Sequence, residues 1–297
     1  MKKEKARATR TRFSPVMIVM CVILCLYVIS LCIPFIWAFI TSFKTRLDFL
    51  DNPIGLPEKW VWNYGTVFSK FRVMITNDQV GQKFVPLGNM FLNSILYAGG
   101  SAIVAAIVPC VTAYLCARFK YKFSKVVYNV VIVTMILPIV GNMPSQIVVT
   151  RTLGVYDRIW GMWLANASFL GLYFLVFYNV FKALPKDFTE AAKIDGANNM
   201  QIFLRVALPV VRNTLFTVML IKFIDFWNDY QTPLVLLPSS PTAAYGLFLM
   251  EKTTENAMNT VPMRMAASMI VFIPIIVIFL LLQKHLLGNL MVGGIKG

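Results

Sequence analysis

A charged segment between two apolar runs limits how this chain can fold. The chain is apolar from about residue 159 to residue 181 and again from Thr214, and EAAKIDGANNMQIFLRVALP, residues 190–209, lies between these runs. The segment and its approach carry seven charged side chains: Lys182, Lys186, Asp187, Glu190, Lys193, Asp195 and Arg205. One charge at the centre of a membrane helix costs roughly 2.5–3.5 kcal/mol, so seven would cost about 20 kcal/mol. The segment must therefore lie outside any bilayer that the flanking runs enter.

The composition supports an integral membrane protein. Apolar residues make up 58% of the 297 residues and charged residues only 14%, whereas soluble domains carry about a quarter charged residues. The net charge of +15 alone could indicate nucleic-acid binding, but the basic residues lie between apolar runs rather than on one face. We therefore expect contact with membrane lipid and no nucleic-acid partner.

Six apolar runs are long enough to cross a bilayer, which takes about 20 residues per helix. The predicted spans cover residues 16–41, 88–117, 127–149, 159–181, 214–237 and 263–283. A basic stretch at residues 1–15 precedes the first run, which is too long for a signal-peptide core, so we expect it to be retained as a span. The sequence thus predicts an all-α membrane protein with an extracytoplasmic segment at residues 42–87.

Lysine and arginine counts orient these spans. With the N-terminus inside, the inner segments carry 17 of these residues and the outer segments carry 10. Because basic residues are enriched in cytoplasmic loops, both termini are expected in the cytoplasm. The charged segment then lies on the cytoplasmic side.

The charged segment has the pattern of two short helices joined by a turn. Asp187 and Glu190 have the spacing of a capping box. Gly196 suits a tight turn because glycine accepts positive φ angles. Asn198 or Asn199 is the expected cap of the second helix.

The second short helix is predicted to be amphipathic, because Ile202, Phe203, Val206 and Ala207 fall on one face. We expect Phe203 to be exposed and Pro209 to end the helix. An exposed apolar helix on the water side suits a groove in a partner protein. The same pattern also fits a helix on the lipid surface or a solvated loop.

The fifth predicted span carries polar groups at helical spacing, because Lys222, Asp225 and Asp229 share one face. Ionisable groups inside a membrane usually face a bundle interior or a watery cavity. Aromatic rings, amides and carboxylates also suit sugar binding. The candidate pathway residues are Lys222, Asp225, Trp227, Asn228, Asp229 and Tyr230. A structural Lys222–Asp225 pair, with Asp229 near the outer interface, explains the pattern equally well.

Features of enzymes and metal sites are missing from the sequence. There is no GxxxxGK[ST] phosphate loop, and His285 is the only histidine, so no Ser-His-Asp or Cys-His arrangement can form. Five cysteines lie in apolar runs without CxxC spacing, which favours free thiols over disulfides or metal ligands. We expect no enzymatic activity, no cofactor and no metal.

The charged segment resembles the EAA loop of ABC-importer permeases, through EAA at 190–192, DGA at 195–197, Phe203, and Leu-Pro at 208–209. Other stretches resemble the carbohydrate subfamily of these permeases: TSFK (41–44), LPEKWVWNY (56–64), NSILYA (93–98), AYLCARF (113–119), FWNDYQTPL (226–234) and the terminal GGIKG. The resemblance covers nearly the whole chain and is closest to the shorter, second permease subunit of maltose-type systems.

The resemblance implies a type I ABC importer permease fold of six transmembrane helices. Its permease core would span residues 88–283, with a cytoplasmic coupling loop at 182–213 that seats in the ATPase and a cytoplasmic tail at 284–297. The implied ATPase-coupling residues are Glu190, Ala191, Ala192, Asp195, Gly196, Ala197, Ile202, Phe203 and Pro209. The implied ATPase-contacting tail consists of Gly293, Gly294, Ile295, Lys296 and Gly297.

The resemblance also implies a function, namely the permease subunit of an ATP-driven carbohydrate importer in a bacterial or archaeal cytoplasmic membrane. The implied partners are a second homologous permease, a cytoplasmic ATPase dimer that hydrolyses ATP, and an extracellular or periplasmic sugar-binding protein. The segment at residues 238–262 would reach toward that binding protein. Two alternatives are an ion-coupled secondary transporter that uses Asp225 and Asp229, and a membrane scaffold that transports nothing.

Overall fold

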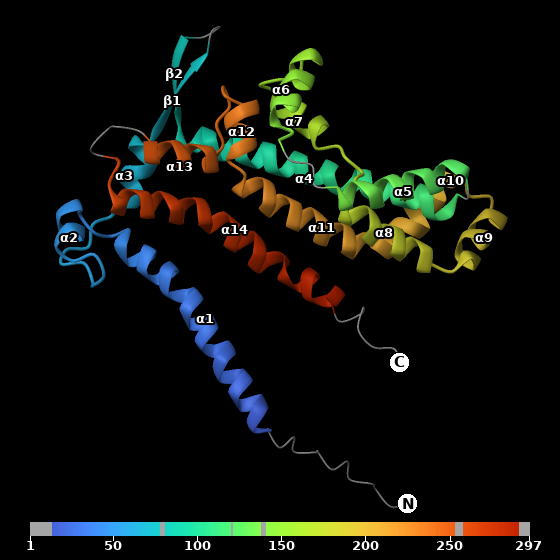
Figure 1. The fold of residues 1–297 in the computed structure, drawn as a ribbon, viewed down its shortest axis with the longest axis horizontal. Helices are drawn as coiled ribbons and strands as arrows, with labels where there is room; N and C mark the ends of the chain where they lie inside the picture. Colours follow the sequence, from blue (N-terminus) through green and yellow to red (C-terminus); the bar gives the residue numbers. More distant parts are fainter. Residues whose placement is uncertain (1–13, 78–80, 120, 138–140, 253–257, 291–297) are drawn as a thin grey trace, which may run out of the picture.

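The protein folds as a bundle of helices with one β-hairpin (Figure 1). The computed structural model describes residues 14–77, 81–119, 121–137, 141–252 and 258–290, and every structural statement below concerns these residues. The elements are α1 (Pro15–Thr41), α2 (Arg46–Asp51), α3 (Asn63–Lys70), β1 (Arg72–Asn77), β2 (Gly81–Pro86), α4 (Leu87–Arg118), α5 (Lys122–Ile136), α6 (Met143–Thr152), α7 (Ile159–Ala165), α8 (Leu172–Ala183), α9 (Lys186–Ile194), α10 (Asn199–Ile202), a π-helical turn η1 (Phe203–Ala207), α11 (Leu208–Asn228), α12 (Gln231–Leu236), α13 (Ala243–Lys252) and α14 (Val261–Leu290).

Four helical stretches among the described residues are long and apolar enough to cross a membrane, which supports a multi-pass membrane protein. They are Pro15–Thr41, Leu87–Arg118, Asn199–Asn228 and Val261–Leu281. They correspond to the first, second, fifth and sixth predicted spans.

The third and fourth predicted spans are not continuous helices, so the described residues do not confirm the count of six. The run at 127–149 is divided into α5 and α6, and the run at 159–181 into α7 and α8. Helix α5 ends before Leu137, which is extended because the residue before a proline disfavours helical backbone. Helix α8 begins after Gly171, whose φ of 116° no helix can continue.

Helix α4 lies at the centre of the bundle and packs against α7, α8, α11 and α13. Its buried face consists largely of small residues: Ala98, Ser101, Ala102, Ala106, Cys110 and Ala113. Small side chains allow neighbouring helices to approach closely. Gly100 shows the same principle, since a β-carbon there would lie 2.1 Å from the Trp163 ring, whose Nε1 donates to the Leu96 carbonyl at 2.9 Å.

The two predicted extracytoplasmic segments form folded structure at one end of the bundle. Residues 42–87 contain α2, α3 and the antiparallel β1–β2 hairpin, in which Arg72 lies opposite Pro86. Residues 238–262 contain α13, which packs against α4, α14 and β1 and buries Tyr245 and Met250. The described part of the second segment is therefore folded against the bundle.

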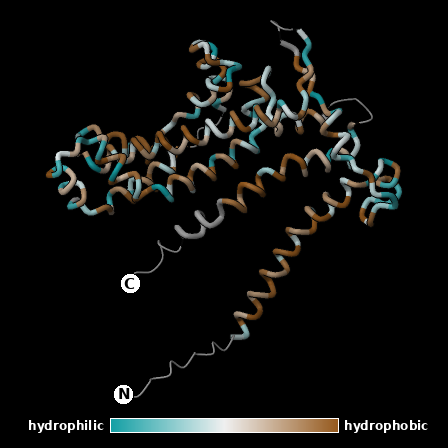
Figure 2. The backbone as a smooth tube through the Cα atoms, turned by 180° about the vertical axis from the view of Figure 1, so that it is seen from behind, coloured by the Kyte–Doolittle hydropathy of each residue, from teal (hydrophilic) through white to brown (hydrophobic). Residues whose placement is uncertain are grey.

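Helix α1 stands apart from the rest of the bundle. It is hydrophobic along nearly all of its length (Figure 2), yet Thr41 at its end is its only buried residue. Its main neighbour is α14, where Phe35 stacks on Phe272 with ring centroids 5.1 Å apart. The remaining apolar surface of α1 suits contact with lipid or another membrane protein.

Candidate functional site

The charged segment folds into α9 and α10 with a turn between them, as the sequence predicts. Gly196 has a φ of 80° and forms the turn. Asn198 caps α10, because its side chain accepts a hydrogen bond from the Gln201 N–H and its own N–H donates to the Gln201 side chain, both at 2.9 Å. The predicted glycine turn and asparagine cap are confirmed.

The predicted capping box at Asp187 is wrong. Helix α9 begins at Lys186, one residue before Asp187. The residue that precedes the helix is Pro185, which provides no side-chain cap. Asp187 therefore lies inside the first turn, where its charge still complements the positive end of the helix dipole.

The helix also continues past Pro209, contrary to the prediction. Helix α10 runs through the π-helical turn η1 into α11, and Pro209 lies in the first turn of α11. Proline lacks an N–H and normally breaks a helix interior. A π-type turn changes the hydrogen-bonding pattern just before Pro209, which lets the chain continue without that donor.

Phe203 is half-buried, which contradicts the prediction that it is exposed. Its ring centroid lies 4.8 Å from that of Tyr114 on α4, and the side chain borders the core between α4, α8 and α11. The neighbouring Ile202 is buried. The exposed apolar side chains of this region are instead Phe188, Ile194, Met200 and Leu204.

Sequence reasoning missed these exposed residues because it assumed that the apolar face of α10 points outward. Ile194 is 87% exposed and directly precedes the turn. The sequence signal for an exposed apolar side chain was the position of Ile194, directly before the charged Asp195 and the turn residue Gly196. Of the other predicted coupling residues, Glu190, Ala191, Asp195, Gly196 and Pro209 are exposed, and Ala192 and Ala197 are half-buried. The predicted tail, residues 293–297, lies outside the described residues.

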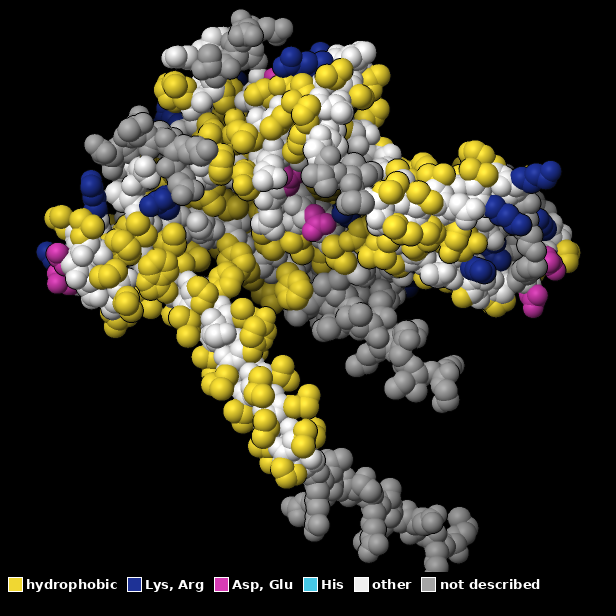
Figure 3. Space-filling model, viewed as in Figure 1, with side chains coloured by type: hydrophobic (Ala, Val, Ile, Leu, Met, Phe, Trp, Pro, Cys, Tyr) yellow, Lys and Arg dark blue, Asp and Glu magenta, His cyan; other side chains and the backbone are white. Residues whose placement is uncertain are grey.

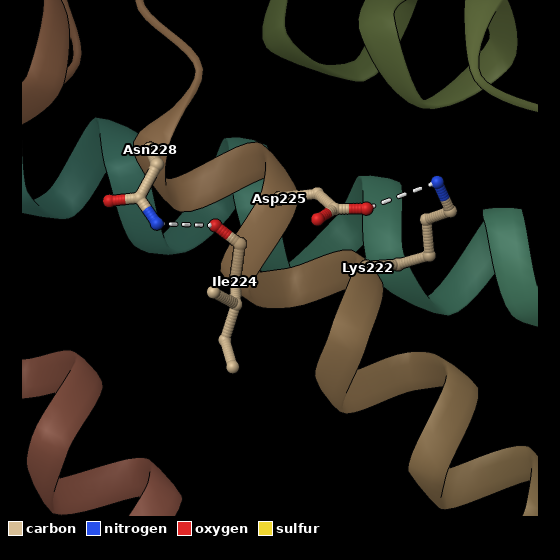
Figure 4. A network of polar contacts seen from close by, with 4 residues as sticks. All are labelled: Lys222, Ile224, Asp225 and Asn228. Carbon is tan, nitrogen blue, oxygen red and sulfur yellow. Dashed lines mark hydrogen bonds and ion pairs between the residues drawn. The ribbon is translucent and has the colours of Figure 1, made fainter. Parts of the chain in front are cut away.

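The candidate pathway residues begin with an ion pair on α11. Lys222 Nζ lies 3.2 Å from Asp225 Oδ2 (Figure 4). The lysine also lies above the ring of Tyr173 on α8, at 5.1 Å. The side chains of Lys222 and Asp225 are 27% and 53% exposed. Charged side chains that are this exposed on a membrane helix require contact with water or with a polar partner.

Asp229 does not share the helical face of Lys222 and Asp225, because α11 ends at Asn228. One carboxylate oxygen of Asp229 accepts a hydrogen bond from the Tyr97 hydroxyl, and the other accepts from the Thr232 N–H, both at 3.0 Å. Asp229 therefore joins α4 to the start of α12.

The remaining candidates occupy two further places. Trp227 is buried and its Nε1 donates to the Val271 carbonyl on α14 at 3.2 Å, so it packs inside the chain. Asn228 and Tyr230 line a cavity of about 680 Å³. The amide of Asn228 donates to the Ile224 carbonyl at 3.0 Å (Figure 4).

Sequence reasoning missed the other residues that line this cavity, among them Phe248, Arg264 and Ser268. The Phe248 ring stacks on Tyr230 with centroids 4.5 Å apart. The available signal was Arg264, a charge at the start of the last apolar run. Stacked aromatic rings with polar groups beside them suit a polyhydroxylated ligand. No group of three or more metal-ligating side chains comes together in the part of the chain that the structure describes.

Comparison with known proteins places these features in a family. The profile of the family described as "Binding-protein-dependent transport system inner membrane component" matches residues 107–290. The chain is 28% identical over 267 residues to the melibiose/raffinose/stachyose import permease protein MelC of Bacillus subtilis (strain 168), covering 89% of this chain and 91% of that protein. It is 30% identical over 218 residues to the sn-glycerol-3-phosphate transport system permease protein UgpE of Yersinia pestis bv. Antiqua (strain Antiqua), covering 71% and 75%.

A solved structure shares the fold. It is the crystal structure of a bacterial ABC transporter involved in the import of the acidic polysaccharide alginate, with a TM-score of 0.73 and 23% sequence identity. The match covers 95% of this chain and 99% of that chain. Since the family profile spans more than half of the sequence, the chain belongs to the inner-membrane components of binding-protein-dependent transport systems, and it is a permease subunit of an ABC importer rather than an enzyme.

Proposed function

We propose that this chain is a permease subunit that imports an oligosaccharide and forms half of the translocation pathway, together with a second homologous permease. Relatives named for melibiose, raffinose and stachyose and for starch degradation products support this substrate class. The observation that supports the coupling role is the exposure of apolar side chains in the α9–α10 segment. It leaves Phe188, Ile194 and Met200 exposed on a charged surface that a bilayer would not cover.

The proposed coupling uses the continuity of one helical stretch. A cytoplasmic ATPase dimer binds the α9–α10 segment and moves it when ATP closes the dimer. Because α10, η1 and α11 form one uninterrupted stretch from Asn199 to Asn228, a displacement of α10 also moves Lys222 and Asp225. This movement would alternate access to a pathway that includes the Lys222–Asp225 pair and the cavity beside Tyr230.

The proposed topology has six membrane passes, with α5–α6 and α7–α8 as the two interrupted ones, and both termini in the cytoplasm. The count of 17 inner against 10 outer basic residues supports this orientation. Single cysteines at Ser240 and Asn199, in a background without the five native cysteines, test it. An impermeant thiol reagent added outside should label position 240 and not position 199; the reverse pattern contradicts the topology.

The tail at residues 293–297 stays a proposal that depends on the resemblance alone. Its deletion should leave the complex assembled but lower the stimulation of ATP hydrolysis by substrate. A tail of this size contributes little to membrane packing, so an assembly defect would contradict this role.

Uptake by intact cells tests the substrate and the energy source. Cells that express the full importer should accumulate labelled raffinose, and vanadate, which blocks ATPases, should stop this uptake. An ion-coupled transporter would instead resist vanadate and respond to a protonophore. Labelled sn-glycerol-3-phosphate serves as the second substrate, because one relative is named for its transport. Uptake of that compound without raffinose uptake would overturn the oligosaccharide assignment.

A further inference from the structure

A cationic cavity lies where α4 and α8 end and α5 begins. Its volume is about 830 Å³, and its lining includes Arg118, Lys122, Lys125 and Lys182. Among the described residues, no carboxylate lines the cavity and none forms an ion pair with these four side chains. Lysine and arginine side chains gather at this end of the molecule (Figure 3). Four uncompensated positive charges repel one another, so a bound anion would stabilise the arrangement.

Arg118 has an unused donor in this region. Its Nη2 donates to the Leu184 carbonyl at 3.0 Å, which holds the guanidinium between the ends of α4 and α8. Its Nε is buried and has no hydrogen-bond partner among the residues that the structure describes. A buried N–H of a charged group costs free energy when it is left unpaired. An anionic oxygen is the partner that such a donor lacks, and guanidinium groups suit phosphate geometry.

The surroundings of the cavity are those of a membrane boundary. Tyr128 and Tyr178 pack with ring centroids 4.9 Å apart, and Lys182 Nζ lies 5.7 Å above the Tyr178 ring. Tyrosine is enriched at the headgroup level of bilayers. The helices that line the cavity also carry exposed apolar side chains, namely Leu115 on α4 and Phe123, Val126 and Val130 on α5. A bound phosphate here would therefore lie beside a surface that acyl chains can cover.

We propose that this cavity binds the phosphate headgroup of an anionic phospholipid. Arg118, Lys122, Lys125 and Lys182 contact the phosphate, and the acyl chains follow the exposed apolar side chains of α4 and α5. Basic pockets between membrane helices commonly bind such headgroups. The recognised chemistry is a phosphate oxyanion, for which soluble phosphate is the other source. The exposed apolar side chains on the lining helices favour the lipid, and the site does not depend on which solute the importer carries.

Native mass spectrometry of the complete importer complex in neutral detergent tests the proposal. Phosphatidylglycerol, phosphatidylcholine and inorganic phosphate are the probes. The wild-type complex should retain phosphatidylglycerol in preference to phosphatidylcholine, and inorganic phosphate should not displace it. Lys122→Gln with Lys125→Gln should weaken phosphatidylglycerol binding about 25-fold, since each lysine near an anionic lipid surface contributes about a fivefold factor. The matched control is Lys59→Gln with Lys70→Gln, which removes the same charge from exposed positions on the other side of the bundle and should leave binding unchanged.

Each remaining outcome overturns the proposal. Equal weakening in the two double variants would show a general charge effect rather than a site. Retention of inorganic phosphate without phosphatidylglycerol would assign the cavity to a soluble anion. Retention of phosphatidylglycerol by the isolated chain but not by the complex would show that a partner subunit covers the cavity.

Discussion

Helix α4 and the α9–α10 segment use apolar side chains in opposite ways. On α4, Ala98, Ala102 and Ala106 are at most 3% exposed, because α7, α8 and α11 cover them. In the α9–α10 segment, Ile194 is 87% and Met200 65% exposed. Both regions contain apolar residues on helices. The first set holds this chain together, and the second remains free for another molecule.

This difference separates residues by the property that their substitution should change. A change on α4 should lower the stability of the chain whether or not partners are present. A change among the exposed residues of the α9–α10 segment should leave the chain stable and weaken partner binding. Pairs of matched variants can therefore test whether the two regions differ in this way.

The largest expected effect concerns Cys110, which is buried on α4. Cys110→Leu adds volume to a packed core and should lower the free energy of unfolding by about 1–3 kcal/mol. The control is Cys25→Leu on α1, where the same substitution is exposed and should change stability by less than about 0.5 kcal/mol. Thermal unfolding in detergent measures both. Equal losses would show that α4 is not the packing centre.

The next effect concerns Ile194. If a groove of the ATPase buries this side chain, Ile194→Ala should weaken ATPase binding by about 1.5 kcal/mol or more, with no loss of chain stability. The control is Ile54→Ala, because Ile54 is 80% exposed at the α2 end of the molecule. Co-purification of the ATPase at graded concentrations reports the affinity. Full retention by Ile194→Ala would remove the main support for docking through this surface.

A smaller effect is expected at Gly196, whose φ of 80° disfavours a side chain although nothing lies within 4 Å of an added β-carbon. Gly196→Val should cost about 1 kcal/mol or more of backbone strain and shift α9 relative to α10. Gly81→Val is the control, since Gly81 has a φ of 72° and equally open space. Both variants should lose similar stability in a thermal scan, but only Gly196→Val should lose sugar uptake. Loss of uptake in both variants would show that misfolding, rather than a defect in coupling, explains the effect.

The smallest effect on stability concerns the Lys222–Asp225 pair. Because both side chains are partly exposed, Asp225→Asn should change stability by less than about 1 kcal/mol. Transport per assembled complex should nevertheless fall. The comparison variant is Asp229→Ala, which leaves the buried Tyr97 hydroxyl without its acceptor and should destabilise the chain by about 1–3 kcal/mol. Unchanged transport by Asp225→Asn would make the pair structural.

Local features of the charged segment could be predicted from the sequence because each depends on neighbouring residues. The Gly196 turn and the Asn198 cap are set by backbone preference and by a side chain that reaches three residues along the chain. The capping box at Asp187 failed because Pro185 allows a helix to start at Lys186. The stop at Pro209 failed because the π-helical turn η1 precedes it, and residue spacing gives no sign of such a turn.

The pathway candidates show where spacing stops being informative. The i, i+3, i+7 pattern assumed one straight helix, but α11 ends at Asn228. Asp229 consequently turns toward Tyr97, and Tyr230 stacks on Phe248, which is distant in sequence. These partners lie on α4 and α13, so no local pattern around residue 229 could identify them.

The membrane character and the resemblance to ABC-importer permeases could be inferred from the sequence alone, which also predicts that the charged segment lies outside the bilayer. Transfer free energies and short-range backbone preferences depend on residue type and neighbours, so they can be evaluated along the chain. Three-dimensional packing was needed to show that Phe203 packs on Tyr114, that Ile194 stays exposed, and that Arg118 shares a cavity with Lys122 and Lys182. These outcomes depend on which helix faces meet, and that is decided by packing between residues far apart in the sequence.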